Sequence, residues 1–152
     1  MIDQLREELE IDEGVKYEIY LDHLGLKTCG VGHLCRKGEP EYDMEVGDPV
    51  SDDRVGELFE KDVGWTISDC HKLLPDFDML PEEVCLIVSN MMFNMGINRM
   101  GMFKRFLTAI EDRDWGKAAV EMEDSRWHKQ VTARADRLIV RMEEMAKKSP
   151  SK

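Results

Sequence analysis

Hydrophobic residues recur along this chain with two different periods. Near the N-terminus Ile2, Leu5 and Leu9 are spaced three or four residues apart, which predicts a short helix over residues 1–11. Between residues 15 and 34 apolar and polar residues alternate, which predicts a β-hairpin that turns at Gly25. From residue 51 onward the helical spacing returns and continues almost to the end of the chain. The pattern therefore predicts an α+β protein whose strands lie in one short segment.

The longest predicted helix covers residues 51–74. Ser51 is a suitable N-cap, two acidic residues follow it, and Pro75 ends the helix. A helix of this length spans about 30 Å, which is enough to cross a small protein. Residues 36–49 are rich in glycine and proline and predict an irregular loop, with a short third strand at 42–46.

The rest of the chain is helical in pattern. Pro81 suits a helix first turn, and the apolar run after it predicts a buried helix that ends at Gly96. Further helices are expected at 103–111, 115–123, 125–129 and 132–147. Trp115, Trp127 and the methionines near residue 95 are expected to fill the core.

These elements predict one domain over residues 1–152. It would comprise a small β-containing lobe (13–50), a connecting helix (51–74) and a helical lobe (75–148) on which helix 1–11 packs. Residues 149–152 would form a frayed tail.

Composition narrows the range of functions. The chain has 21 basic and 32 acidic residues, a formal net charge of −11, which argues against nucleic acid as a partner. It has no apolar run of about 18 residues that would span a membrane and no N-terminal signal-peptide pattern. We expect a monomer that is made in the cytoplasm.

The four cysteines are scattered, and free thiols are the expected state. Alternation would place Cys29, His33 and Cys35 on one strand face, where zinc is conceivable. Structural zinc needs a fourth ligand, and none is near in the sequence. We therefore expect buried thiols and neither a metal nor a cofactor.

Two carboxylates flank the predicted hairpin. Glu13 lies where the first helix ends, and partial desolvation there would help it hold a proton, as a general acid must. Asp22 lies near the turn and should stay ionised. Alternation places Thr28, Gly30, Gly32 and Leu34 on one face, which we interpret as the floor of a cleft. The alternative is that both acids merely belong to an acidic surface.

Three motifs decide between these interpretations. The first is Glu13, Asp22 and Thr28 at their spacing, followed by Gly-Val-Gly-His-Leu; the second is Asn90–Gly96; the third is Ser125-Arg126-Trp127 with Arg134-Ala135-Asp136-Arg137. Together, and in this order, they resemble the lysozymes of the T-even bacteriophage type over nearly the whole chain.

The resemblance implies a lysozyme-like fold with a cleft between two lobes joined by the long helix. It also implies an inverting muramidase, in which Glu13 is the general acid while Asp22 and Thr28 position the water. It places Phe93 and Asn94 at the substrate, in addition to Gly30, Gly32 and Leu34 on the predicted cleft floor, although Asn94 stands where family members often carry glutamine. It further implies that Arg134 pairs with the acid and that His33 pairs with Asp62.

The resemblance also suggests a biological role. It implies an endolysin that cleaves the β-1,4 bond between N-acetylmuramic acid and N-acetylglucosamine in peptidoglycan, and that needs a holin to reach the wall. Familiar members are basic, so an acidic chain also fits a virion-associated or weakly active wall-binding module. Activity on chitin would use the same residues.

Overall fold

The computed structural model describes residues 1–148, so the expected frayed tail at 149–152 lies outside the described residues. The fold is α+β. Its helices are α1 (Ile2–Glu13), α2 (Asp52–Leu73), α3 (Glu82–Met102), α4 (Lys104–Glu111), α5 (Trp115–Glu123), α6 (Arg126–Gln130) and α7 (Thr132–Lys148). Its strands are β1 (Lys16–Leu21), β2 (Lys27–Gly30) and β3 (His33–Leu34). Two short 3₁₀ helices cover Pro40–Asp43 and Phe77–Met79.

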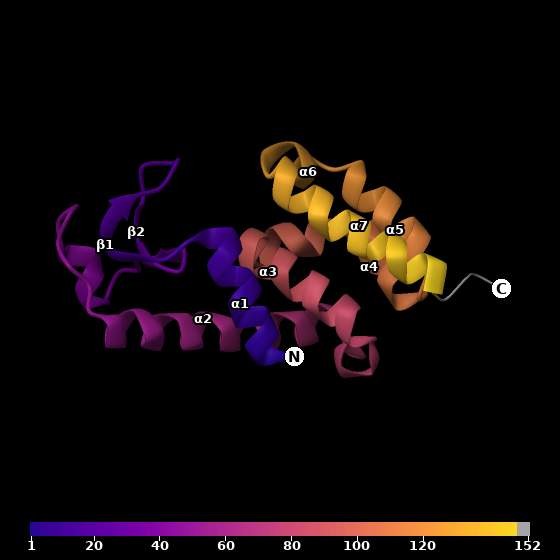
Figure 1. Ribbon diagram of the computed structural model, residues 1–152, viewed down its shortest axis with the longest axis horizontal. Helices are drawn as coiled ribbons and strands as arrows, with labels where there is room; N and C mark the ends of the chain where they lie inside the picture. The colour runs from indigo at the N-terminus through magenta and orange to yellow at the C-terminus, as the bar shows by residue number, and fades with distance from the viewer. Residues whose placement is uncertain (149–152) are drawn as a thin grey trace. The chain divides into compact units, whose positions relative to one another are not determined.

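The chain forms two compact units. Ile2–Trp65 form the first, here called the sheet unit, while Met1 and the chain from Thr66 onward form the second, the helical unit. Helix α2 begins in the sheet unit and ends in the helical unit (Figure 1). The expected packing of the first helix on the helical lobe stays a prediction.

The sheet is antiparallel in the order β1-β2-β3. Tyr20 pairs with Thr28 across β1 and β2, and Thr28 pairs with Leu34 across β2 and β3. Because directly opposite residues in an antiparallel pair point to the same face, these three side chains share one face of the sheet.

The prediction of one returning strand over residues 27–34 was wrong. The chain reverses at Gly30-Val31-Gly32, and both glycines have φ of +60°, a conformation that side chains with a Cβ disfavour. The two glycines therefore form a tight turn, not the floor of a flat strand. The third strand predicted at 42–46 is also wrong, because a 3₁₀ helix occupies Pro40–Asp43 and His33–Leu34 form the third strand.

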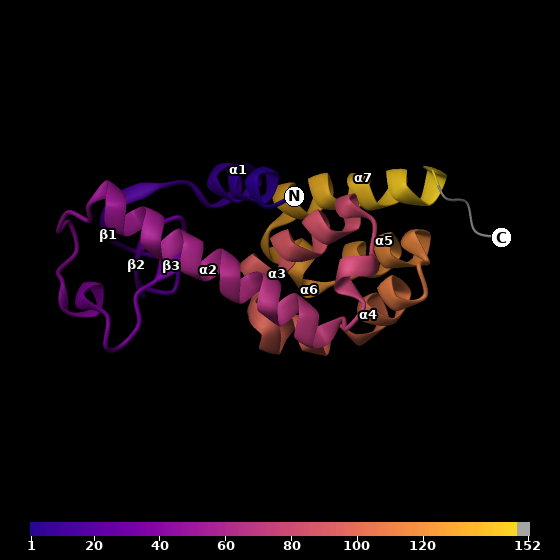
Figure 2. The same cartoon turned by 90° about the horizontal axis from the view of Figure 1, so that it is seen from below.

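The sheet unit has its own small core. Figure 2 shows the strands beside the first half of α2, and the buried residues joining them are Ile19, Cys29, Cys35, Val50, Val55 and Leu58. Helix α2 starts as expected, because the Ser51 hydroxyl accepts a hydrogen bond from the Arg54 amide at 3.1 Å.

The helical unit is built around α3, whose residues from Val84 to Met92 are all buried. Gly96 has φ 79° and ψ 161°, so the regular helix that begins at Glu82 ends there as expected. A second helical segment, which the sequence pattern did not predict, continues to Met102. Helices α5 and α7 lie side by side over this core (Figure 1). Trp115 and Trp127 are buried in it, as the sequence predicted. No helix in residues 1–148 is long and apolar enough to cross a membrane.

Candidate active site

Asp22 lies immediately after β1 and is held by the turn that follows. Its Oδ1 accepts hydrogen bonds from the backbone amides of Leu24 at 2.8 Å and Leu26 at 2.9 Å. The Leu26 bond outweighs the opposing effect of burial and lowers the pKa of Asp22, and the Leu24 bond lowers it further. The side chain is partly exposed, so an ionised carboxylate faces solvent at the tip of the hairpin.

Thr28 lies on β2 and is buried. Its hydroxyl donates a hydrogen bond to the carbonyl oxygen of Leu26 at 3.0 Å. The backbone of Leu26 thus holds the side chains of both Asp22 and Thr28, since its N–H donates to Asp22 and its carbonyl accepts from Thr28. The hydroxyl proton of Thr28 is engaged, which leaves its oxygen to act as an acceptor.

Glu13 is the last residue of α1, and its side chain lies against the turn between β2 and β3. A Cβ atom added at Gly32 would be 2.6 Å from Oε1 of Glu13 and 3.2 Å from its Cδ. Only glycine at position 32 lets the carboxyl group approach the backbone this closely. Glu13, Asp22 and Thr28 all belong to the sheet unit, where one hairpin and its neighbouring turn position them.

Tyr20 is a neighbour that the sequence interpretation missed. It lies directly opposite Thr28, with its ring partly buried and the Lys16 ammonium 4.4 Å from the ring centroid. Burial raises the pKa of the Tyr20 phenol, and the negative charge of Glu13 raises it further. Strand alternation could have placed Tyr20 beside Thr28 if the pairing register of β1 and β2 had been known.

His33 forms the expected pair with Asp62, together with a second carboxylate that the sequence did not reveal. Its Nδ1 is 2.6 Å from Oδ2 of Asp62, and its Nε2 is 2.9 Å from Oε1 of Glu39. Burial lowers the pKa of His33, but the hydrogen bonds and charges of Asp62 and Glu39 together outweigh burial and raise it. The cluster joins β3, the following loop and α2.

Three of the remaining predicted residues, Phe93, Asn94 and Arg134, belong to the helical unit. Arg134 is buried on α7, and its Nε donates to Oδ1 of Asn90 at 2.8 Å. The side-chain oxygen of Asn94 accepts a hydrogen bond from Nε1 of Trp127 at 2.8 Å, which orients the amide, and Phe93 beside it is partly buried. In the sheet unit, the Leu34 side chain is 43% exposed. Substrate contacts of these residues, and of Gly30 and Gly32, stay predictions.

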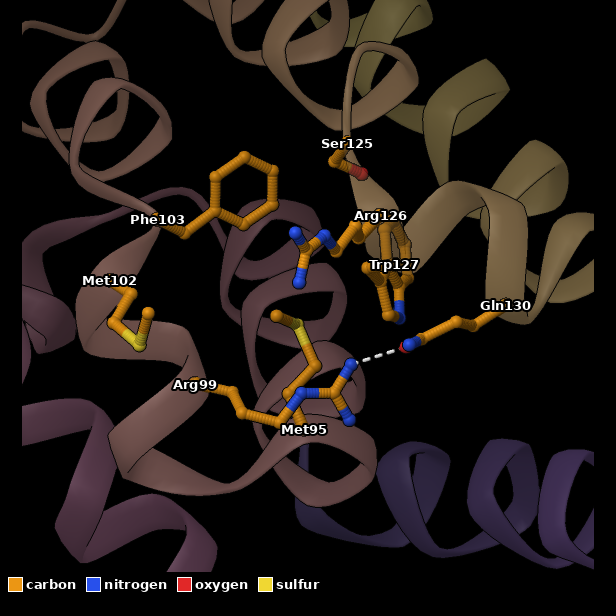
Figure 3. A pocket seen from close by; sticks show the side chains of 8 residues that line it. All are labelled: Met95, Arg99, Met102, Phe103, Ser125, Arg126, Trp127 and Gln130. Carbon is orange, nitrogen blue, oxygen red and sulfur yellow. Dashed lines mark hydrogen bonds between the residues drawn. The ribbon is translucent and has the colours of Figure 1, made fainter. Parts of the chain in front are cut away.

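The helical unit contains an open hollow of about 450 Å³. Its lining is Met95, Arg99, Met102, Phe103, Ser125, Arg126, Trp127 and Gln130. Figure 3 shows the Arg126 side chain extending from α6 toward Phe103, and the Arg99 guanidinium hydrogen-bonded to the side-chain oxygen of Gln130. Two guanidinium groups on an apolar floor make this a locally basic surface on an acidic protein.

The structure offers no metal site among residues 1–148, where no group of three or more His, Cys, Asp or Glu side chains could hold an ion. Cys29 and His33 are paired across β2 and β3, and the Cys35 thiol is 3.9 Å from that of Cys29. The nearby carboxylates are engaged by His33 and by Arg54, which binds Glu41 at 2.9 Å. The side chains of Glu13, Asp22 and Thr28 supply two carboxylates and a hydroxyl, a set that suits acid–base chemistry.

Comparison with known proteins identifies the family. The family model described as phage lysozyme matches residues 10–144. The chain is 31% identical over 158 residues to "Probable T4-type lysozyme 2" of Dictyostelium discoideum, which covers 91% of this chain and 93% of that protein. It is also 31% identical over 155 residues to "Pre-baseplate central spike protein Gp5" of Enterobacteria phage T4, covering 90% of this chain and 27% of that protein. The chain therefore belongs to the phage lysozyme family of glycoside hydrolases.

Proposed function

We propose that this protein hydrolyses the β-1,4 bond between N-acetylmuramic acid and N-acetylglucosamine in peptidoglycan with inversion at the anomeric carbon. Glu13 donates a proton to the leaving oxygen, while Asp22 and Thr28 deliver the water. Family membership supports the substrate class. The observation that carries the assignment of roles is that the backbone of Leu26 holds Asp22 and Thr28 together.

That arrangement suits a nucleophilic water. The Thr28 hydroxyl donates its hydrogen bond to the Leu26 carbonyl, so its oxygen can accept a hydrogen bond from the water. The Asp22 carboxylate, with Oδ1 occupied by two amides, accepts the second hydrogen and takes the proton as the bond forms. Both water hydrogens are then directed to the protein, and a lone pair is directed at the sugar. Such a route needs room for a water between sugar and base, which in inverting enzymes corresponds to carboxyl groups about 6.5–9.5 Å apart.

The acid is tested by Glu13→Gln, which keeps the side chain's size but has no proton to donate. We expect kcat to fall by about 10²–10⁴-fold. Glu10→Gln, an exposed residue three positions earlier on α1, is the matched control and should leave kcat unchanged. Wild-type turnover by Glu13→Gln would refute the proposed mechanism.

The stereochemistry is tested on the first product formed. Proton NMR of the earliest product should show the α-anomer and no covalent glycosyl-enzyme should accumulate. An initial β-anomer would instead make Asp22 the nucleophile.

For the physiological role, we propose an endolysin that accumulates in the host cytoplasm and reaches the wall through a holin. A relative named as a phage spike protein, together with the net charge of −11, favours a second candidate, a virion-associated or weakly active wall-binding module. Turbidity loss of outer-membrane-permeabilised cells separates them. Lysis at enzymatic, substoichiometric amounts supports the endolysin, whereas saturable wall binding without release of reducing sugar supports the binding module.

A further inference from the structure

The sheet unit holds two thiols side by side in its core, next to the proposed site. Sγ of Cys35 is 3.9 Å from Sγ of Cys29, and both side chains are at least nine-tenths buried. Cys29 directly follows Thr28 on β2, and Cys35 directly follows Leu34 of β3. The two sulfurs therefore lie next to each other on the two chain segments that the Gly30–Gly32 turn joins.

The other two cysteines provide an internal comparison. Sγ of Cys70 lies 4.0 Å from the Ser89 hydroxyl, and Sγ of Cys85 lies 3.3 Å from the Phe77 carbonyl oxygen. Neither has a thiol as its hydrogen-bond partner. Only Cys29 and Cys35 are arranged as a dithiol among the described residues.

Of the two cysteines, Cys35 lies at the edge of a hollow. It lines an open hollow of about 450 Å³, whose other lining residues are Gly25, Leu26, Lys27, Leu34, Tyr42 and Asp43. Cys29 does not line this hollow and is fully buried. A small disulfide would therefore meet Cys35 first.

The ionisation of the two thiols supports the same order. Burial and the neighbouring Cys35 raise the pKa of Cys29 to about 12. Burial also raises the pKa of Cys35, and the charges of Glu39 and Glu41 add to the rise, whereas the hydrogen bond with Cys29 and the charge of Lys27 oppose it. Because the thiolate is the nucleophile, the smaller rise in pKa favours Cys35 over Cys29 as the first thiol to attack.

The geometry points to Cys29 and Cys35 as a modification site that closes into a disulfide by exchange with a small disulfide reagent such as oxidised glutathione. The inference is independent of the proposed function.

The exchange proceeds in two balanced steps. The Cys35 thiolate attacks one sulfur of the reagent, whose S–S bond breaks and releases one thiolate. The Cys29 thiolate then attacks the Cys35 sulfur of the mixed disulfide and releases the second thiolate. The reagent gains two electrons, and the two cysteine protons pass to the released thiolates. Closure draws the sulfurs from 3.9 Å to about 2.05 Å.

The test uses the native full-length protein in oxidised glutathione, followed by alkylation and tryptic mass mapping. Trypsin cuts after Lys27 and Arg36, so both cysteines fall in one peptide, residues 28–36. We expect this peptide to appear two hydrogens lighter and unalkylated, at a rate at least about 10-fold above any modification of Cys70 or Cys85. Alkylation of both cysteines after prolonged oxidation, or two stable glutathione adducts, would overturn the inference.

Two variants test the order of attack. Cys29→Ser should trap the intermediate as a stable glutathione adduct on Cys35, and Cys35→Ser should leave Cys29 about 10-fold slower to react than Cys35 in Cys29→Ser. Equal rates would overturn Cys35 as the entry thiol, while the wild-type peptide map needs no variant to fold. Cys70→Ser combined with Cys85→Ser is the matched control and should keep the disulfide-forming peptide.

Discussion

At the residue scale, the Glu13 carboxyl lies so close to Gly32 that a Cβ atom at position 32 would be 2.6 Å from its Oε1. The turn between β2 and β3 offers no side chain at this position, so the last residue of α1 can place its carboxylate there. A proton donor in glycoside hydrolysis must be placed relative to the bond it cleaves, and misplacement by about 1 Å can cost about 10²-fold in rate.

Gly32→Ala should therefore damage activity more than stability. The added Cβ would displace Glu13, and kcat should fall by about 10²-fold, while the strain of a positive φ should cost about 1–2 kcal/mol in the free energy of unfolding. Gly47→Ala is the control, because Gly47 also has a positive φ but nothing lies within 4 Å of a Cβ there. Urea denaturation and initial rates measure both effects. Equal rate losses in the two variants would show that backbone strain, and not displacement of Glu13, limits activity.

At the scale of elements, His33 joins three segments of the sheet unit. Each ring nitrogen faces a carboxylate acceptor, Asp62 on α2 and Glu39 in the loop after β3. A neutral imidazole donates only one hydrogen bond, so one nitrogen would then present a lone pair to a carboxylate oxygen. Only the imidazolium satisfies both, which agrees with the raised pKa of His33.

This cluster predicts how stability depends on pH. Because the pKa of His33 is raised by folding, its contribution is complete below the unfolded pKa of about 6.5 and is lost as pH rises through the folded value. The pKa of Glu39 is lowered, so its contribution is lost only at more acidic pH, as pH falls. His33→Gln should cost about 3 kcal/mol near pH 6 and progressively less above the folded pKa of His33.

The measurement is urea denaturation of both proteins from about pH 6 to about pH 9, a window that starts above the titration of Glu39. His71→Gln is the control, because the more exposed His71–Asp78 pair should contribute little, about 0–1 kcal/mol. If wild type and His33→Gln differ in their free energy of unfolding by the same amount over this whole pH window, the result would contradict the assignment of His33 as an imidazolium.

At the scale of the whole molecule, the net charge of −11 opposes approach to an anionic wall. The Debye length is about 30 Å at 0.01 M salt and about 8 Å at 0.15 M, so added salt shortens the range of this repulsion. Against this negative net charge, the positive side chains of Arg99 and Arg126 line one hollow. A neighbouring hollow is lined by two basic residues and two acidic ones, Lys104, Arg105, Glu121 and Asp124.

We therefore expect wall activity to rise as salt is added up to about physiological strength, through faster association or a lower apparent KM. Initial lysis rates of permeabilised cells from about 10 to about 300 mM NaCl measure it, and a short neutral chito-oligosaccharide, which has no wall field, should show a smaller effect. A lysis rate that falls steadily as salt is added would mean that a local basic surface, such as the hollow lined by Arg99 and Arg126, governs binding to the wall.

Local physics in the sequence predicted most of the architecture. The α2 start at Ser51, the interruption at Gly96 and the burial of Trp115 and Trp127 depend on capping, backbone freedom and apolar spacing, which are readable from nearby residues. The spacing of Glu13, Asp22 and Thr28 also indicated the family, because one hairpin and the helix before it carry all three. The pairing of His33 with Asp62 was available only through family resemblance.

The tertiary structure decided what depends on contacts between elements. Alternation could not show that Gly30 and Gly32 turn the chain, because a period of two is the same in one strand and in two. Nor could it place Glu39 on His33 or the carboxyl of Glu13 against Gly32, since each contact joins separate segments. The sequence thus determined which residue types were available and in which elements, because periodicity and capping are local. Packing decided which side chains meet, because those contacts form only when distant segments come together.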